Sequence, residues 1–292
     1  MLASGHRGAP SGLRSHPSNL IRLGPAKGAF QPVVPRVLTI AGSDSGGGAG
    51  IQADLKAFAA AGAHGLSAIV ALTAQNTLGV TAVHEVPPAF IEDELDAVFS
   101  DIGVDAAKTG MLFSRAVVET VAGYLEQHRV PLVVDPVMLA SSGAQLLQDD
   151  AVDALVRLLF PLATVVTPNL AEARALVRNS LLQASKAELA EALVGFGAAA
   201  AIVTGGHGDP VDHLFDGREH VEIPVERLDT GATHGAGCTH SAALAAFLAR
   251  GLPLADAARA ASRLAVGAVR TGLAELGAGD GPVDVLNVKG AP

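Results

Sequence analysis

The residues near position 240 combine a glycine-rich turn with the start of a helix. The segment Gly235-Ala236-Gly237-Cys238-Thr239 precedes an unbroken helix-forming run at 241–250. Small residues let the backbone bend tightly, and the first turn of a helix leaves several N–H groups without internal partners. These N–H groups and the positive end of the helix suit an anion, such as a phosphoryl group in transfer. The same pattern also occurs in ordinary loops, so other parts of the chain have to support this interpretation.

Polar residues and glycines gather immediately after short apolar stretches that we predict as β-strands. In open parallel sheets, ligands bind beyond the carboxyl ends of the strands. We therefore expect six stretches to contribute to one site: 42–50, 73–79, 108–111, 135–143, 167–172 and 204–208.

The predicted elements alternate between strand and helix along the chain. Predicted strands lie at 37–40, 67–72, 104–108, 132–134, 164–166 and 200–203, with a small flap strand at 81–86 and a hairpin at 214–215 and 220–224. Predicted helices lie at 51–61, 88–100, 114–128, 150–160, 170–177, 185–196, 239–250 and 254–273. Alternation of this kind predicts an α/β fold with a mostly parallel sheet covered on both faces.

Composition limits the class of protein. The chain has 292 residues, of which 49% are hydrophobic, and no apolar run is long enough to span a membrane. A net charge of −9 argues against a nucleic-acid partner. One cysteine cannot form an internal disulfide, which fits a cytoplasmic protein. Residues 1–35 are rich in Gly, Pro, Ser and Arg without periodicity, and we expect a disordered extension ahead of a single domain at 36–292.

Several common motifs are absent. The sequence has no Gly-x-x-x-x-Gly-Lys-Ser/Thr motif and no Gly-x-Gly-x-x-Gly after a predicted strand, which excludes a P-loop enzyme and weakens a dinucleotide interpretation. The ten histidines show no paired spacing typical of structural zinc.

The remaining blocks resemble one family. Ala-Gly-Ser-Asp-Ser-Gly-Gly-Gly-Ala-Gly at 41–50, continued to 56, is similar to the opening signature of the hydroxymethylpyrimidine/phosphomethylpyrimidine kinases of thiamine biosynthesis, in the ribokinase-like superfamily. Further matching blocks keep the family order and together cover about 37–285: 73–77, 108–112, 134–138, 167–169 with Glu172, 205–207 and 233–239. The resemblance implies a three-layer α/β/α fold with a small β flap, and a homodimer.

By this resemblance the reaction is ATP-dependent phosphorylation of 4-amino-5-hydroxymethyl-2-methylpyrimidine, and then of its monophosphate to the diphosphate. Related sugar kinases carry an Asp base where this family has cysteine, here Cys238. A helix N-terminus lowers the pKa of a thiol from about 8.5, so Cys238 is the candidate base, although a free cysteine is also commonly a small buried hydrophobic residue. Gly235, Ala236 and Gly237 are expected to donate N–H groups to the developing phosphoryl charge.

On the pyrimidine side the resemblance implicates Gly42, Asp54, Gln75 and Met111. The amide of Gln75 offers a donor and an acceptor, which complement an amine beside a ring nitrogen. Each of three residues also has an ordinary structural interpretation: Gln75 as a solvent-facing turn residue, Asp54 as an acid in the first turn of a helix, and Met111 as core packing.

On the nucleotide side the resemblance implicates Asp135, Asn169, Glu172 and Thr204. We expect Glu172 and Asn169 to act on Mg²⁺ mainly through water, because Mg²⁺ takes oxygen ligands and keeps several waters. Both residues also suit helix capping after Pro168, and the two roles are compatible. Lys108 is either part of the site or a surface ammonium at a strand end.

Three positions depart from the family pattern. Thr204 stands where relatives often carry a lysine near the ATP phosphates, and Ala232 and Ala236 replace an asparagine and a threonine. Two alternatives to a pyrimidine kinase stay open: a pyridoxal or pyridoxine kinase of the same superfamily, and a non-catalytic pyrimidine-binding regulatory protein that has lost efficient use of ATP.

Overall fold

The structure, a computed structural model, describes residues 34–140, 143–178, 183–205 and 210–291. The extension expected at 1–35 lies outside these residues, except for its last two. Nine strands form one sheet in the described part of the chain: β1 Arg36–Asp44, β2 His64–Asn76, β3 Gly79–Glu85, β4 Ala106–Thr109, β5 Leu132–Val134, β6 Val165–Val166, β7 Ala201–Val203, β8 Val211–Phe215 and β9 His220–Pro224.

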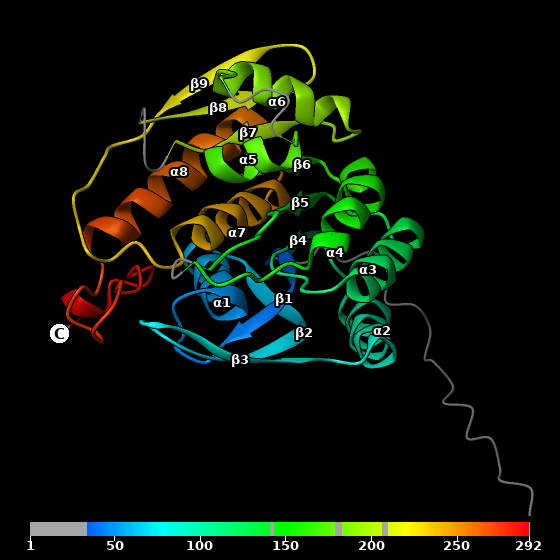
Figure 1. Cartoon of the computed structure of the whole chain (residues 1–292), viewed down its shortest axis with the longest axis horizontal. Helices are drawn as coiled ribbons and strands as arrows, with labels where there is room; N and C mark the ends of the chain where they lie inside the picture. Colours follow the sequence, from blue (N-terminus) through cyan, green and yellow to red (C-terminus); the bar gives the residue numbers. More distant parts are fainter. Residues whose placement is uncertain (1–33, 141–142, 179–182, 206–209, 292) are drawn as a thin grey trace, which may run out of the picture. The chain divides into compact units, whose positions relative to one another are not determined.

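Eight α-helices connect and flank these strands within the described ranges (Figure 1). They are α1 Gly50–Ala60, α2 Pro88–Ala97, α3 Arg115–Gln127, α4 Asp149–Ala154, α5 Leu170–Leu176, α6 Lys186–Gly195, α7 Ala236–Ala249 and α8 Leu254–Arg270. A π-helical turn continues α2 (Val98–Ile102) and another continues α4 (Leu155–Leu159), and short 3-10 helices lie at Phe160–Leu162 and Val288–Gly290.

The strands are ordered β3-β2-β1-β4-β5-β6-β7-β8-β9. Neighbours from β2 to β7 pair in parallel, whereas β3, β8 and β9 pair antiparallel to their neighbours. Chain order reverses between β1 and β4, so the topological switch point of the sheet lies between these two strands. The α/β fold with a mostly parallel sheet is thereby confirmed.

Two hydrophobic clusters show which helices cover which face. One cluster joins the inward sides of α2 to α6 to alternate strand residues such as Leu38 and Val134. The other joins α1, α7 and α8 to the opposite strand residues, such as Val37 and Val133. Successive strand residues point to opposite faces, so this alternation follows directly from the pleat. The expected three layers are confirmed.

Helix α7 occupies the centre of its layer. It contacts β1, β4 and β5 beneath it, with α1 and α8 beside it. All its residues from Thr239 to Ala246 are buried, because small side chains allow close approach on every side. The helix that begins at the glycine-rich turn is therefore held rigidly against the sheet.

The flap differs from expectation. Strand β2 continues through the predicted polar turn to Asn76 and pairs antiparallel with β3. Exposed and half-buried residues alternate from Leu72 onward, as in a ribbon exposed on one face. Polar composition at 73–76 therefore marks an exposed strand, and only residues 77–78 form the turn.

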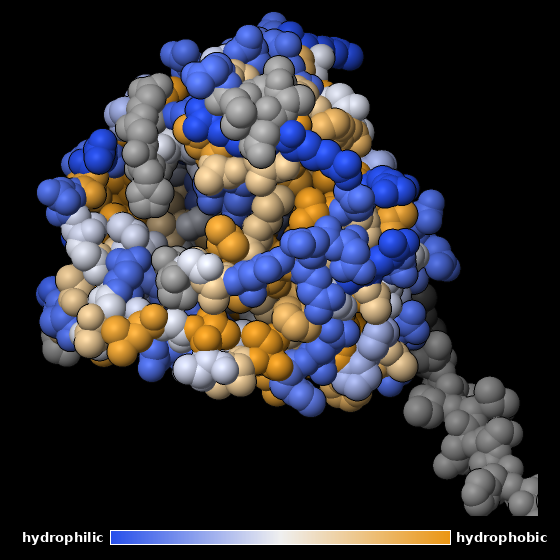
Figure 2. Space-filling model, viewed as in Figure 1, coloured by the Kyte–Doolittle hydropathy of each residue, from blue (hydrophilic) through white to orange (hydrophobic). Residues whose placement is uncertain are grey.

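The outer surface is mixed. Hydrophobic residues appear in small groups between hydrophilic ones over the visible face (Figure 2). Among the described residues, no helix combines the length and the apolar character needed to cross a membrane.

Phe58 and Phe90 form a matched pair for testing the core. Phe58 on α1 is fully buried, whereas Phe90 on α2 is 55% exposed. We expect Phe58→Ala to lower the free energy of unfolding by about 3–5 kcal/mol, because it leaves a cavity between α1 and the sheet. Phe90→Ala should change it by less than about 0.5 kcal/mol. Urea denaturation measures both, and equal effects would contradict the packing described above.

Candidate active site

The carboxyl ends of the parallel strands open into a cavity of about 1120 Å³. It extends along the sheet edge from Gln75 on β2 to Thr204 after β7. With neighbouring strands about 4.8 Å apart, the five steps between β2 and β7 correspond to roughly 24 Å. This length accommodates a small ring at one end and a nucleotide at the other.

Almost every residue singled out in the sequence lines this cavity. They are Gly42, Gln75 and Met111 near β1, β2 and β4, then Asp135, Asn169, Glu172 and Thr204 after the later strands, and residues 235–238. The six sequence stretches expected to form one site therefore converge in their described residues. Gly206 and His207, which belong to the expected motif after β7, lie outside the described residues.

Asp54 is the exception. Its side chain is completely buried and does not line the cavity, so a direct substrate contact is not possible in this arrangement. It is the fifth residue of α1, one position beyond the first turn. Instead it accepts hydrogen bonds from Lys108 Nζ at 2.8 and 2.9 Å, and from the Thr39 hydroxyl at 2.6 Å.

Lys108 is fully buried at the switch point of the sheet, opposite Thr39 in the parallel register of β1 and β4. It is no surface ammonium, and part of it lines the cavity. Its Nζ lies 3.9 Å from Asp135 Oδ2. Burial lowers the pKa of Lys108, but the charge of Asp54 and the weaker effects of Cys238 and Asp135 outweigh burial and raise it above its ordinary value. The lysine therefore stays charged.

The free N–H donors at the start of α7 differ by one residue from those expected. Gly235 has a positive φ of 84°, and a Cβ there would lie 1.8 Å from the Gly48 carbonyl oxygen, so only glycine fits. The N–H of Ala236 already donates to the Thr233 carbonyl at 3.0 Å. Among the described residues, the N–H groups of Gly235, Gly237 and Cys238 have no hydrogen-bond partner. Of the three N–H groups predicted to bind an anion, those of Gly235 and Gly237 are therefore unpartnered, and that of Cys238 takes the place of Ala236.

Cys238 is the third residue of α7. Desolvation raises the pKa of its thiol to about 12, and the charges of Asp54 and Asp135 add to this effect. Lys108 and a hydrogen bond from the Gly50 backbone lower the pKa without compensating. The expectation of a lowered pKa is therefore wrong for the free protein, because desolvation of the half-buried thiol outweighs the Lys108 charge and the Gly50 hydrogen bond.

Asn169 and Glu172 form a capping box at the start of α5. Asn169 Oδ1 accepts from the N–H groups of Ala171 and Glu172, and Glu172 Oε2 accepts from the Asn169 N–H, all at 2.9 Å. Capping is thus confirmed for both residues. Both lone pairs of the Asn169 oxygen are occupied, and its amide nitrogen cannot ligate a cation. A metal contact is therefore less suited to Asn169 than to Glu172.

The electrostatics near Glu172 favour a cation. Burial, together with the charge of Asp135, raises the pKa of Glu172 to about 8. The hydroxyl of Thr167 also lines the cavity and is buried without a hydrogen-bond partner among the described residues. No group of three or more His, Cys, Asp or Glu side chains in the described ranges is arranged to hold a metal ion. Two carboxylates and a hydroxyl nevertheless fit Mg²⁺, which keeps most of its waters.

At the far end of the cavity, the Thr204 N–H donates to the Pro168 carbonyl at 3.0 Å. The next N–H, of Gly205, donates to the buried Asp212 carboxylate at 2.8 Å. Asp212 also accepts from Ser262 on α8 at 2.8 Å. The backbone after β7 is therefore held by a buried carboxylate, although Thr204 itself carries no charge.

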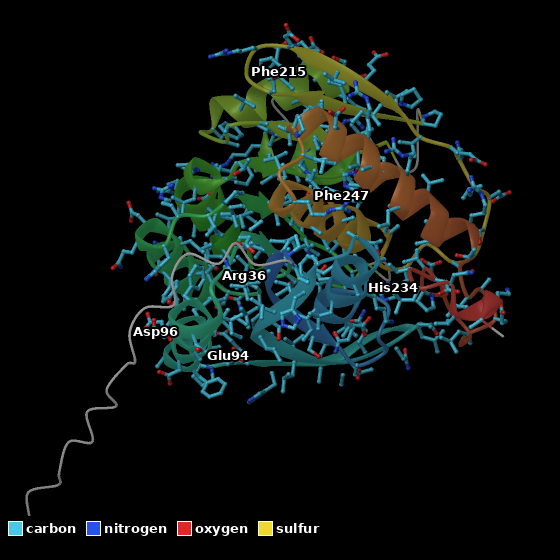
Figure 3. The ribbon with its side chains drawn as sticks, turned by 180° about the vertical axis from the view of Figure 1, so that it is seen from behind. Arg36, Glu94, Asp96, Phe215, His234 and Phe247 are labelled. Atoms are coloured by element: carbon cyan, nitrogen blue, oxygen red, sulfur yellow. The ribbon has the colours of Figure 1, made fainter. Side chains whose placement is uncertain are left out.

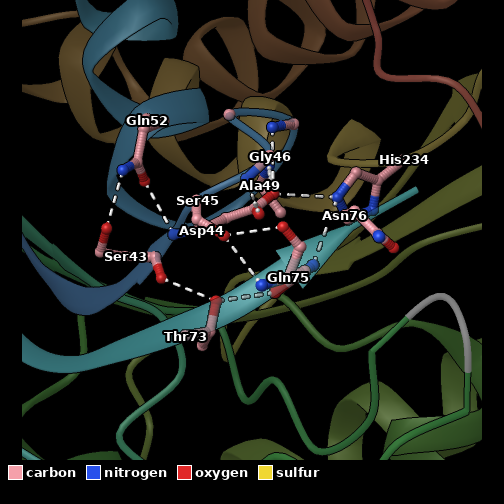
Figure 4. A network of polar contacts seen from close by, with 12 residues as sticks. Ser43, Asp44, Ser45, Gly46, Ala49, Gln52, Thr73, Gln75, Asn76 and His234 are labelled. Carbon is pink, nitrogen blue, oxygen red and sulfur yellow. Dashed lines mark hydrogen bonds and ion pairs between the residues drawn. The ribbon is translucent and has the colours of Figure 1, made fainter. Parts of the chain in front are cut away.

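Sequence reasoning missed a pair that joins the two glycine-rich segments. Asp44, at the end of β1, accepts from the N–H groups of Gly46, Gly48 and Ala49, and His234 Nε2 lies 3.0 Å from Asp44 Oδ2 (Figure 4). Burial raises the pKa of Asp44, but these hydrogen bonds, that from His234 first, bring it below its ordinary value. In Figure 3, His234 lies well away from Arg36, which begins β1. An aspartate before a glycine run is a local signal, but its partner 190 residues away is not.

Apart from Asp54, the residues expected to contact the pyrimidine lie on β1, on β2 and after β4. Gln75 is half-buried on β2 and is not a turn residue. Met111 is 7% exposed and packs with Ala71 and Leu146, so core packing is confirmed. It also lines the cavity, and its contact with the substrate stays a prediction. The N–H of Gly42 donates to the Met111 carbonyl at 3.1 Å, and a Cβ at Gly42 would lie 2.3 Å from Met111 Cε. The end of the Met111 side chain would therefore have to move if residue 42 carried a side chain.

A parallel sheet with a cavity at its switch point, free N–H donors at the start of a central helix, and carboxylates at the strand ends define the protein as a ribokinase-like small-molecule kinase. Comparison with known proteins narrows this class. The phosphomethylpyrimidine kinase family model matches residues 44–284, and the chain belongs to this family.

Two relatives and two solved structures are informative. The chain is 49% identical to the hydroxymethylpyrimidine/phosphomethylpyrimidine kinase of Rhizobium meliloti over 84% of this chain and 95% of that one. It is 50% identical to the thiamine biosynthesis bifunctional protein of Geobacter sulfurreducens, covering 85% of this chain but only about half (51%) of that longer protein.

Among solved structures, a pyridoxal kinase of Bacillus subtilis in an ADP complex superposes with a TM-score of 0.79 at 35% identity, over 88% of this chain and all (100%) of that one. A phosphomethylpyrimidine kinase of Clostridium difficile superposes with a TM-score of 0.68 at 36% identity, over 78% of this chain and 96% of that one.

The buried ion pair yields a stability test. Lys108→Met leaves the Asp54 carboxylate buried without its counter-charge, and we expect the free energy of unfolding to fall by about 3–5 kcal/mol. Combining it with Asp54→Leu should recover part of this loss. Arg115→Met, which breaks the exposed pair with Glu119, should have no measurable effect. Equal destabilisation by the single and double variants in urea would contradict a buried ion pair.

Glu172 yields a pH test in the absence of metal. Its pKa is raised from 4.5 to about 8, so its contribution to stability is fully present below pH 4.5 and is lost as the pH rises through 8. Glu172→Gln should remove this loss. Glu188, the matching capping-box residue of α6, has a lowered pKa, so Glu188→Gln should instead remove a loss at acidic pH. Urea unfolding of both variants from acidic pH to above pH 8 measures these changes in stability. Matching pH profiles for the two variants would contradict opposite pKa shifts at Glu172 and Glu188.

Proposed function

We propose that the protein transfers the terminal phosphoryl group of ATP to the hydroxymethyl group of 4-amino-5-hydroxymethyl-2-methylpyrimidine, and then phosphorylates the monophosphate to the diphosphate. The observation that carries this proposal is the cavity itself. Its substrate end holds an amide on β2, its far end holds carboxylates, and two free N–H donors and a thiol lie at the start of α7. Family membership and relatives at 49% and 50% identity support the same reaction.

The backbone of α7 supplies the electrostatic part of catalysis. The N–H groups of Gly237 and Cys238 are oriented by the helix and need no rearrangement to meet negative charge on the transferring group. Gly235 permits the sharp turn, and Ala236 closes it through its bond to Thr233. Phosphoryl transfer depends mainly on such positioning and electrostatic stabilisation.

Cys238 is the proposed proton acceptor for the substrate hydroxyl. Its thiol is protonated at neutral pH in the free protein, because its pKa is raised to about 12. The thiolate fraction therefore grows about tenfold for each pH unit below that value. Lys108 is the fixed charge that favours the thiolate.

The other site residues divide between the two substrates. Gly42, Gln75 and Met111 are proposed to contact the pyrimidine, while Asp54 supports them indirectly by holding Lys108. Asp135 and Glu172 are proposed to face the phosphates of the nucleotide. Asn169 and Thr204 line the same end and are proposed to contact it through polar groups.

Mg²⁺ is proposed to be held by Glu172 and Asp135, mainly through water, and when bound it would neutralise phosphate charge. Asp135 is held in place by the Ser241 hydroxyl at 2.8 Å, and Glu172 by the backbone of Asn169. A second backbone hydrogen bond, from Met138, also reaches Glu172, so both carboxylates are held in place.

A pyridoxal kinase is the nearest alternative, because the pyridoxal kinase of Bacillus subtilis has the higher TM-score of the two solved structures. The pyrimidine kinases of the family are the more similar in sequence. Steady-state ATP consumption with the pyrimidine alcohol, pyridoxal and pyridoxine side by side tests the proposal. The pyrimidine should give the highest kcat/KM, and a higher value for pyridoxal would overturn it.

A cytoplasmic homodimer with a kinase domain at 36–292 completes the proposal. It is based on the family resemblance and the single cysteine. Sedimentation equilibrium decides the assembly: a particle of twice the 29.3 kDa chain mass supports it, and a monomer at micromolar concentration contradicts it.

Replacement of Cys238 tests its role most directly. Cys238→Ala should lower kcat by about 10²–10⁴-fold with little change in the binding of either substrate, because a base acts only as the proton departs. In the unaltered enzyme kcat/KM should rise with pH over roughly pH 6 to 9, and this slope should disappear in the variant. A folded Cys238→Ala protein with near-normal kcat would reject Cys238 as the base.

A further inference from the structure

The side-chain amide of Gln75 lies between two polar groups whose protons can be assigned (Figure 4). Gln75 Oε1 is 3.2 Å from Thr73 Oγ1, and Gln75 Nε2 is 3.5 Å from His234 Nε2. Rotation by 180° about the last side-chain bond exchanges the oxygen and the nitrogen with almost no change of shape. The direction of this amide is therefore decided by hydrogen-bond chemistry.

The Thr73 hydroxyl has a single proton. Its oxygen lies 2.9 Å from the Ser43 carbonyl oxygen, which is only an acceptor, so the proton is donated there. The lone pairs of Thr73 Oγ1 then remain for the amide. The amide nitrogen of Gln75 can donate to Thr73 Oγ1, whereas the amide oxygen would be repelled by the lone pairs of that hydroxyl.

His234 Nε2 carries a proton for a similar reason. It lies 3.0 Å from Asp44 Oδ2, and this carboxylate already accepts the N–H groups of Gly46, Gly48 and Ala49. A carboxylate with these donors is ionised and only accepts, so the nitrogen facing it must donate. An amide nitrogen beside this N–H would face another donor, whereas an amide oxygen would be attracted.

We propose that Asp44 and His234 fix the direction of the Gln75 amide, with its oxygen toward His234 and its nitrogen toward Thr73, and so determine which heteroaromatic edge the cavity reads. Asp44 and His234 are positioning residues, which act on the substrate through Gln75. Because β1, β2 and the segment before α7 each contribute one member, the direction is set by the fold and not by the substrate.

If the proposed pyrimidine is the substrate, this direction of the Gln75 amide selects one edge of its ring. The amine of the ring donates to the amide oxygen on the His234 side, and the adjacent ring nitrogen accepts from the amide nitrogen on the Thr73 side. A 4-oxo analogue presents the reverse order, with a carbonyl oxygen beside a ring N–H. Both contacts are then mispaired, which costs more than losing either one.

Nuclear magnetic resonance of the free, full-length protein tests the direction without any activity measurement. The Gln75 side-chain amide signals are identified by their loss in Gln75→Glu. We expect cross-relaxation from these amide protons to the Thr73 methyl group. Separately, we expect the His234 Nε2 atom to carry a proton. Cross-relaxation to the His234 ring instead, or an unprotonated Nε2, would overturn the proposal.

Substrate selectivity tests the consequence. Unaltered enzyme should prefer the 4-amino over the 4-oxo pyrimidine alcohol by at least about 30-fold in kcat/KM, since two buried groups are mispaired. His234→Phe keeps a ring beside Gly48 but removes the N–H, and Thr73→Val removes the other partner. Each should reduce the preference by about tenfold or more. The control Thr81→Val alters a hydroxyl that bonds to Ala74 on the same flap, and should leave the preference unchanged.

The ratio of kcat/KM for the 4-amino and 4-oxo pyrimidines distinguishes a positioning role of His234 from a general loss of structure. Loss of activity toward both pyrimidines by the same factor in His234→Phe would overturn the positioning role, because a general structural defect cannot change the ratio. If unaltered protein phosphorylates neither pyrimidine, the proposed function fails, while the resonance measurement still decides the direction of the amide.

Discussion

A charged lysine removed from water is the constraint on which this site depends. Lys108 is neutralised by Asp54, which in turn is held by Thr39 on the neighbouring strand, and these three residues come from β4, α1 and β1. Asp135 faces the same ammonium and is tied to α7 through Ser241. A buried ion is tolerated only when its partners are placed accurately, so the pair fixes the strands and helices that meet at the switch point.

The same burial determines what the site can offer to a phosphoryl group. Because Asp54 compensates Lys108, the most direct attraction for an anion comes from the N–H groups of Gly237 and Cys238 and from the end of α7. Burial also keeps the Cys238 thiol protonated in the free protein. In the proposed reaction, the site therefore relies on prearranged N–H donors, and the thiol acts at the moment of transfer.

Local patterns predicted the fold and the location of the site well, because polar residues at strand ends must converge at one edge of a parallel sheet. They failed where the answer depends on distant packing. The burial of Asp54 depends on Lys108, 54 residues away, and the Asp44–His234 contact spans 190 residues. Whether Ala236 or Cys238 offers a free N–H depends on the bond from Ala236 to Thr233, which residue type does not reveal. The helix end alone suggested a lowered thiol pKa, because desolvation cannot be judged from sequence.

The rate of alkylation of Cys238, measured against pH in the free protein, shows directly whether desolvation or the nearby positive charge determines the thiol pKa. The chain has one cysteine, so no other thiol contributes to the signal. With a pKa of about 12, the logarithm of the rate should rise steadily with pH and reach no plateau within the range in which the protein stays folded. A plateau near or below the ordinary thiol pKa of about 8.5 would mean that the helix end and Lys108 outweigh burial, and would contradict the account.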